Sequence, residues 1–358
     1  MLLLSETDKK ILEQYSPIPN GKAFSEKSVF HFSVATKDVS VIVPCYNSQE
    51  YLNECLKSIL QQKTNFDFEV IAVNDGSTDD TGNILNVLAQ KYNRLRVITQ
   101  VNKGFSGARN TGISESRGKY LIFVDSDDYI SEGYIDGLME AAISKETDIT
   151  ACCYYSFYNN KKYKVVRPKN EQDSSLLNGC FWAKTFKREL FSNIMLPEGY
   201  WYEDSILAHL IYPKVTKYSS VDTCEYAYRK NPNGITETSK RQKKALDTFY
   251  ITDLMLDSVR QLLGMEYYRS NAYYEILIEQ FYLNQRRLIG LPLQIQKCVF
   301  FNQALFINNS YSGKTTNNSD RKLFEDSLRQ NNFFKCVLAV KLDKLYKVGK
   351  IVSYFERK

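Results

Sequence analysis

The sequence of 358 residues has little histidine and no paired cysteine motif, and these absences exclude several kinds of site. Its two histidines, His31 and His209, and eight cysteines without a CxxC pair argue against a zinc site. The adjacent Cys152 and Cys153 cannot easily close an unstrained disulfide. The cysteines are therefore interpreted as small buried residues in a reducing compartment.

Long hydrophobic runs are also absent. No apolar stretch approaches the roughly 18–20 residues that a membrane-spanning helix needs. The apolar opening, residues 1–4, is followed at once by acidic side chains, which makes it too short and too acidic for a secretory signal. We expect a cytoplasmic protein, with the inner face of the cell membrane as a place of contact.

The excess of basic over acidic residues is small, whereas aromatic residues are abundant. The net charge of +6 suits a phosphate-bearing substrate or an anionic lipid surface and is too small to indicate nucleic acid. With 26 tyrosines and 20 phenylalanines, the chain has many flat surfaces on which rings can stack.

The order of apolar segments predicts an α/β domain. Residues 1–37 lack steady periodicity and are expected to form an N-terminal extension. After them come the expected strands 39–43, 68–73, 95–98, 120–124 and 149–155, the last leading into a hairpin at Asn159-Asn160. Stretches of helical spacing separate the first four strands, which is typical of parallel βαβ units. Such sheets bind ligands at the carboxyl ends of their strands.

A helical region is expected to follow the α/β domain, with the boundary between residues 238 and 239. This region, 239–358, is a candidate for acceptor binding, self-association into a homo-oligomer, or membrane contact. Residues 334–355 place apolar side chains, including Leu338 and Leu342, on one helical face with lysines mostly opposite. Such a basic amphipathic helix can lie in an anionic membrane surface, here through residues 333–358. It can equally pack on its own domain and leave a solvated lysine face.

Polar residues follow each of the first four expected strands. They are Pro44-Cys45-Tyr46-Asn47, Asn74-Asp75-Gly76-Ser77, a glycine-containing segment from Asn102 to Asn110, and Asp125-Ser126-Asp127-Asp128. Because the carboxyl ends of parallel strands share one edge of a sheet, we expect these groups to lie close together.

The acidic segment after the fourth strand predicts a metal site. Residues i and i+2 of an extended segment point to the same side, so Asp125 and Asp127 can converge. Their mutual repulsion would be relieved by a hard cation such as Mg²⁺ or Mn²⁺, with substrate phosphates completing its shell. The alternative is that these aspartates only begin a turn.

The other two strand ends offer groups for a nucleotide. Asp75 can accept hydrogen bonds from a base or ribose, and Gly76 lets the backbone approach closely. Arg109 and the amides that open the following helix favour an anion. Alternatively, Asp75 caps the next helix, Gly104 and Gly107 permit tight packing, and Arg109 pairs with an acidic neighbour.

Together these motifs resemble those of glycosyltransferase family 2. The segments from Val39 to Asn47, from Val73 to Asp79, from Asn102 to Gly112 and from Asp125 to Asp128 match its pattern in order and spacing. The resemblance is dense over residues 37–135 and thinner to about 235. It implies an α/β, GT-A fold, the Rossmann-like fold of nucleotide-diphospho-sugar transferases: a mixed sheet flanked by helices, here followed by a mainly α-helical C-terminal region.

The resemblance also implies roles for single residues. Donor binding is implied for Pro44, Tyr46, Asn47, Asp75, Asn102, Gly104, Arg109, Asp125 and Ser126. Asp127, with Asp125, is implied to hold a divalent Mn²⁺ or Mg²⁺ that bridges the diphosphate. In the thinner region, Glu203-Asp204 resembles the family's acidic pair, whose aspartate is the catalytic base; Asp204 is the expected base. The alternative is that this pair only stabilises a helix N-terminus.

Acceptor contacts are expected from Trp182, Trp201, Glu203 and Arg229, although each could equally be structural. Processive synthases of the family carry membrane spans and a Gln-x-x-Arg-Trp motif, and this chain has neither. The expected function is therefore inverting, metal-dependent transfer of one sugar at a time, of the hexosyltransferase type. The donor would be a nucleotide sugar, and the resemblance to the family implies a UDP sugar. The acceptor would be a hydroxyl of a glycan or lipid-linked molecule in bacterial cell-surface polysaccharide synthesis.

Two other functions remain open. A sugar nucleotidyltransferase would share the sheet and the metal carboxylates. It should also carry a glycine-rich, lysine-bearing loop after the first strand, where this chain has Pro44-Cys45-Tyr46-Asn47. A non-catalytic relative that only binds nucleotide sugar would not need both Asp127 and Asp204.

Overall fold

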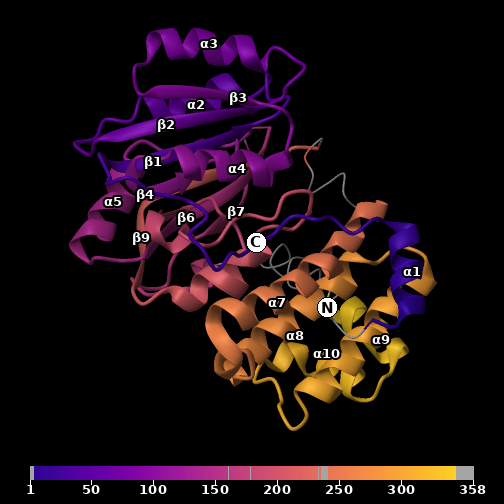
Figure 1. Cartoon of the computed structure of the whole chain (residues 1–358). Helices are drawn as coiled ribbons and strands as arrows, with labels where there is room; N and C mark the ends of the chain where they lie inside the picture. Colours follow the sequence, from indigo (N-terminus) through magenta and orange to yellow (C-terminus); the bar gives the residue numbers. More distant parts are fainter. Residues whose placement is uncertain (1–3, 160, 178, 233, 235–240, 344–358) are drawn as a thin grey trace. The chain divides into compact units, whose positions relative to one another are not determined.

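The computed structural model describes residues 4–159, 161–177, 179–232, 234 and 241–343, which divide into two compact units (Figure 1). One unit runs from Asn20 to Glu237, and the other combines Met1–Pro19 with Thr238–Lys358. Of the expected N-terminal extension 1–37, the first nineteen residues therefore group with the C-terminal unit and the rest with the sheet.

The first unit is built on one mixed sheet, which has nine strands among the described residues. They are β1 (Lys37–Cys45), β2 (Phe68–Asp75), β3 (Leu95–Gln100), β4 (Gly118–Phe123), β5 (Tyr129–Ile130), β6 (Ile149–Tyr158), β7 (Lys161–Val166), β8 (Lys184–Lys187) and β9 (Tyr218–Arg229). Their spatial order is β3-β2-β1-β4-β8-β6-β9-β5, with β7 beside β6. Strands β1 to β4 pair in parallel, as expected, and β8 runs antiparallel to both β4 and β6.

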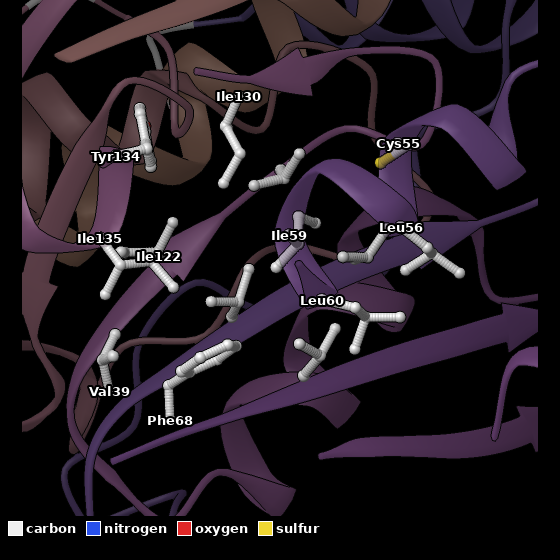
Figure 2. Close-up of a cluster of buried hydrophobic side chains, with 14 of the residues drawn as sticks. Val39, Cys55, Leu56, Ile59, Leu60, Phe68, Ile122, Ile130, Tyr134 and Ile135 are labelled. Atoms are coloured by element: carbon white, nitrogen blue, oxygen red, sulfur yellow. The ribbon is translucent and has the colours of Figure 1, made fainter. Parts of the chain in front are cut away.

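Helices cover both faces of this sheet. They are α2 (Leu52–Leu60), α3 (Thr81–Lys91), α4 (Gly104–Glu115) and α5 (Tyr134–Ser144). Alternate residues of β1 point to opposite faces, so Val39, Val41 and Val43 join one core with α2, α3 and α5. Ile42 points the other way, toward Gly112 of α4. Figure 2 shows the α2 side chains converging on those of β1, β4 and α5.

The strand register brings the expected polar segments to one edge. Cys45 of β1 lies beside Asn74 of β2, and Asp75 lies beside Gln100 at the end of β3. On the other side of β1, Ile42 pairs with Phe123, so the residues just after β4 emerge at the same level. Four loops from separate parts of the sequence therefore meet at the carboxyl edge of the parallel strands.

Shorter elements complete the sheet unit. The expected hairpin forms between β6 and β7, although Asn160 at its tip lies outside the described residues. The apolar segment after Asp204, expected to be a regular helix, contains a five-residue π-helix, Leu207–Ile211. Turns of 3₁₀ helix occur at Ser174–Leu176, Arg188–Phe191 and Tyr212–Lys214.

The second unit is helical, as expected for residues 239–358. Its helices are α1 (Glu6–Tyr15), α7 (Asp247–Tyr268), α8 (Asn271–Arg287), α9 (Leu293–Ser310) and α10 (Lys322–Arg329), with 3₁₀ turns at Lys243–Leu246 and Ser319–Arg321. Residues 333–343 form a further helical segment. Within the described parts of both units, no helix is long and apolar enough to cross a membrane.

Candidate active site

The loops after β1 and β2 hold each other through side chains. Asn47 has a left-handed backbone with φ of 48°, and its backbone N–H donates to Ser77 Oγ (3.1 Å). In return, its side-chain Oδ1 accepts a hydrogen bond from the backbone N–H of Thr78 (2.9 Å). Asn47 thus fixes the entrance to the expected base pocket. Near it, Pro44 is half-buried and Tyr46 is 52% exposed, which leaves the tyrosine ring accessible for stacking.

Asp75 is buried at the end of β2 and anchors the segment that follows β3. Its Oδ1 accepts hydrogen bonds from Gln100 Nε2 (2.7 Å) and from the backbone N–H of Lys103 (2.9 Å). Gly76 has a φ of 72°, and a Cβ there would lie 2.9 Å from the backbone nitrogen of Asn102. Gly76 was expected to let the backbone approach a nucleotide closely. In the structure it allows a close approach to the loop that contains Asn102.

Helix α4 begins at this edge without a side-chain cap from its N-cap residue, Lys103. Asn102 Oδ1 instead accepts from the backbone N–H of Gly104 (3.1 Å), and Gly104 has a φ of 73°. The first-turn amides of α4 thus open beside the expected nucleotide position, where their partial positive charge favours an anion.

The aspartates after β4 occupy different environments. Asp125 and Asp127 are both partly exposed, and partial burial together with the negative charge of Asp125 raises the pKa of Asp127. Asp128 is buried and accepts hydrogen bonds from the Tyr226 hydroxyl (2.6 Å) and the backbone N–H of Arg229 (2.6 Å). Burial and the neighbouring aspartates raise the pKa of Asp128 well above its usual range. Asp128 is thus the structural member of the group, which leaves Asp125 and Asp127 at the surface of the site.

Strand β9 and its C-terminal end support this acidic loop. Arg229 Nε donates to the backbone oxygen of Asp127 (2.7 Å), and the guanidinium lies over the rings of Tyr51 and Phe157. Asn231 Nδ2 donates to Asp127 Oδ2 (3.1 Å). Ser126 is joined to the β1 loop through a 2.7 Å contact between its hydroxyl and that of Ser48. Arg229, expected to contact the acceptor, therefore holds the acidic loop in this structure.

Arg109 links the acidic loop to the distant Glu203-Asp204 pair. One guanidinium nitrogen donates to Asp125 Oδ1 (2.8 Å) and another to Glu203 Oε1 (2.5 Å), across 94 positions of sequence. Arg109 and Glu203 are 7% and 8% exposed. Burial raises the pKa of Glu203 to about 7, in spite of the opposing charge of Arg109. The two carboxylates in turn raise the pKa of Arg109.

The expected base, Asp204, follows directly after this buried pair. Tyr202, just before the pair, has a φ of 67°, so the backbone turns sharply there. Asp204 is only partly buried, and its Oδ2 lies 3.6 Å from where a Cβ on Gly179 would be. The link from Asp125 through Arg109 to Glu203 therefore joins the residue before Asp204 to the acidic loop.

The two tryptophans differ in their surroundings. Trp182 stacks on Tyr226 (centroids 5.0 Å apart, 12° between planes) and on Tyr228 (5.2 Å, 20°). Trp201 is partly exposed and meets Tyr202 edge-on at 6.4 Å. Since the Tyr226 hydroxyl also donates to Asp128, Trp182 packs behind the acidic loop, and both tryptophans are partly exposed.

Removal of Arg109 should destabilise the fold. We expect Arg109→Ala to lower the free energy of unfolding by about 3–5 kcal/mol, because the buried carboxylate of Glu203 would lose its counter-charge. The double variant Arg109→Ala/Glu203→Gln should recover part of this loss. Chemical denaturation measures both, with Arg260→Ala on the exposed face of α7 as control. If Arg109→Ala proves as mild as the control, the buried link does not stabilise the fold.

Comparison with known proteins places this site in a family. The model of "Glycosyl transferase family 2" matches residues 40–198. The chain is 36% identical over 217 residues to the uncharacterized glycosyltransferase EpsJ of Bacillus subtilis, a match that covers 56% of this chain and 63% of EpsJ, just under two thirds. It is 32% identical over 221 residues to glycosyltransferase GlyG of Streptococcus pneumoniae, covering 56% of this chain and 73% of GlyG.

Solved structures agree on the fold. The crystal structure of S. aureus TarS residues 1–349 in complex with UDP-GlcNAc superposes with a TM-score of 0.66 at 20% identity, covering 87% of this chain and 92% of that one. The likeness confirms the expected GT-A class, with its mixed sheet, flanking helices and helical C-terminal region. From the family model and the relatives together, the chain belongs to glycosyltransferase family 2.

Proposed function

We propose that this protein moves one sugar at a time from a nucleotide-sugar donor to an acceptor hydroxyl, with inversion at the anomeric carbon. The observation that carries the proposal is the position of Arg109 between Asp125 and Glu203. It joins the loop expected to hold the donor diphosphate to the segment expected to hold the base. An inverting transferase needs the donor diphosphate and the general base on opposite sides of the anomeric carbon.

The acidic loop fits a divalent cation, Mn²⁺ or Mg²⁺, held by Asp127 and Asp125. Burial and the negative charge of Asp125 raise the pKa of Asp127, and a bound cation would stabilise its ionised form. Among the described residues, no group of three or more His, Cys, Asp or Glu side chains is arranged to hold a metal. The remaining ligands would then be donor phosphates and water, as is usual for Mg²⁺. When bound, the cation would stabilise negative charge on the departing diphosphate.

Asp204 acts in this proposal as the general base. It accepts the proton of the acceptor hydroxyl as that oxygen attacks the anomeric carbon and the bond to the diphosphate breaks. A single displacement of this kind inverts the anomeric centre. Glu203, held by Arg109, fixes the backbone from which Asp204 projects.

The substrates are proposed by class. UDP is the favoured nucleotide because the similar TarS fold was solved with UDP-GlcNAc, although that likeness concerns the fold alone. The acceptor is proposed to be a hydroxyl of a glycan or lipid-linked molecule in cell-surface polysaccharide synthesis, met at the inner face of the membrane.

Donor binding can be tested by thermal unfolding with a panel of nucleoside diphosphates and their sugars. With Mn²⁺, a UDP compound at about 100 times its dissociation constant should stabilise the protein by about 2.7 kcal/mol. That corresponds to a shift of several degrees, and chelator should abolish it. If another nucleotide gives the shift, the choice of UDP is wrong. If none does, with or without metal, the four loops do not form a donor site.

A further inference from the structure

The helical segment 333–343 presents two unlike faces. One face is buried in its own unit through Phe333, Cys336, Ala339 and Val340. Phe333 meets Phe300 of α9 edge-on, with centroids 5.6 Å apart. One face of the segment therefore packs against its own helical unit, and the opposite face points away from that packing.

The other face of the segment is apolar and exposed. Phe334, Leu338 and Leu342 follow one another at intervals of four residues and are 80%, 50% and 45% exposed. This spacing places them in one stripe along the helix. Leu338 and Leu342 belong to the apolar face expected from the sequence, whose remaining members, Leu345 to Phe355, lie outside the described residues.

Helix α9 adds two more exposed apolar side chains. Phe301 and Leu305, again four residues apart, are 41% and 47% exposed. Phe301 follows Phe300, the ring that contacts Phe333, so α9 and the segment 333–343 are neighbours. We call these five side chains, Phe301, Leu305, Phe334, Leu338 and Leu342, the apolar face. Single exposed apolar residues are ordinary, but a stripe of three on one helix, packed on a second helix that exposes two more, indicates a contact surface.

Most of the exposed charge beside the segment is positive, and the exposed Asp326 of α10 is paired with Lys335 (3.2 Å). Lys341 is exposed beside Leu342, and Lys297 of α9 lies 6.0 Å from the Phe333 ring. The single acidic residue of the segment, Asp343, turns inward: it accepts a hydrogen bond from the Tyr282 hydroxyl (2.5 Å) and lies 3.7 Å from Arg321. The sequence from 344 to 358 adds five basic residues and one acidic residue. Whatever covers the apolar face should therefore be negatively charged.

We propose that the apolar face docks on an anionic lipid bilayer. Phe334, with the two leucines of its stripe, enters the boundary between headgroups and acyl chains, while the lysines lie at the level of the lipid phosphates. A protein partner would satisfy the apolar side chains equally well. The bilayer is favoured because residues 344–358, which follow the segment in sequence, contain five basic residues and one acidic residue, and because Asp343 is turned inward. This proposal does not depend on the identity of the donor.

Flotation of the full-length protein with vesicles tests the proposal. We expect binding to vesicles containing phosphatidylglycerol, weaker binding at high salt, and little binding to pure phosphatidylcholine. Phe334→Ser/Leu338→Ser should weaken anionic-vesicle binding about tenfold or more, because two apolar anchors are lost. Lys341→Glu should weaken it about tenfold through charge alone. Met265→Ser, an exposed apolar position on α7, is the matched control and should bind like the wild type.

Three results would overturn the proposal. The first is equal binding to neutral and anionic vesicles, and the second is unchanged binding of Phe334→Ser/Leu338→Ser. The third is a wild-type protein that does not bind vesicles but forms a concentration-dependent dimer, seen by light scattering, which the double variant does not form. That last result would assign the apolar face to a second copy of the chain. Because these side chains are exposed, the variants should unfold at the wild-type temperature, which separates lost docking from lost folding.

Discussion

Asp204→Asn should lower the rate of sugar transfer by about 10²–10⁴-fold, the usual contribution of a general base. Asparagine has nearly the same size as aspartate, but it cannot take up the proton of an acceptor hydroxyl. Donor binding should stay close to that of the wild type, since Asp204 faces the acceptor in the proposed arrangement. Turnover and donor affinity are measured on the same preparation.

The control for this variant is Asp222→Asn, which makes the same chemical change at an exposed position of β9. It should transfer sugar at the wild-type rate. Retained turnover in Asp204→Asn would exclude Asp204 as the base. Loss of both turnover and donor binding would instead give Asp204 a role in forming the donor pocket. A chain that binds nucleotide sugar without transferring it would show no difference between the two variants.

Asp127→Asn should abolish metal-dependent donor stabilisation and lower transfer by roughly 10³-fold, because a Lewis-acid cation supplies several kcal/mol of transition-state stabilisation. The ligand-free protein should be as stable as the wild type or more stable. Burial and the charge of Asp125 raise the pKa of Asp127, so its ionised form is disfavoured in the folded state and a neutral amide removes that cost.

This combination separates a metal ligand from a structural residue. A structural role for Asp127 would make Asp127→Asn less stable in the absence of any ligand. Asp128→Asn is the contrasting variant and should be less stable than the wild type without ligand. The buried Asp128 carboxylate accepts two short hydrogen bonds, from the Tyr226 hydroxyl and the backbone N–H of Arg229. If Asp127→Asn keeps a metal-dependent shift with donor, then the cation is held elsewhere.

The parallel part of the sheet could be predicted from the sequence because each strand is a short apolar run followed by polar residues. Strands β1 to β4 extend at most a few residues beyond the predicted ranges. Strand β8 could not be recognised this way: it has four residues, two of them lysines, and it forms because β4 and β6 both pair with it. Strand β7 is almost wholly exposed and has no apolar pattern to detect.

The sequence predicted which segments meet at the carboxyl edge of the parallel strands, but not how their side chains contact one another. The i, i+2 spacing of Asp125 and Asp127 indicated a shared side, but it did not show that Asp128 beside them is buried. Arg109 was expected against the nucleotide, with pairing to an acidic neighbour as the alternative, and the structure shows the acidic pairing. That it contacts Glu203, 94 positions away, depends on the tertiary structure. The contacts of Tyr226 and Asn231 with the acidic loop were likewise not predicted. Tyr226 lies in β9 and Asn231 follows it, about a hundred positions along the sequence from the aspartates that they contact.

The most direct test of the central claim is nucleoside diphosphate release from a panel of nucleotide sugars, measured with Mn²⁺ and with chelator. We predict that the wild type releases one nucleotide in a metal-dependent manner, faster with an acceptor present, and that Asp127→Asn and Asp204→Asn release it at least about 100-fold more slowly. Should no nucleotide sugar be turned over under conditions in which a donor demonstrably binds, the site would be a binding site without transfer activity, and the proposed function would be contradicted.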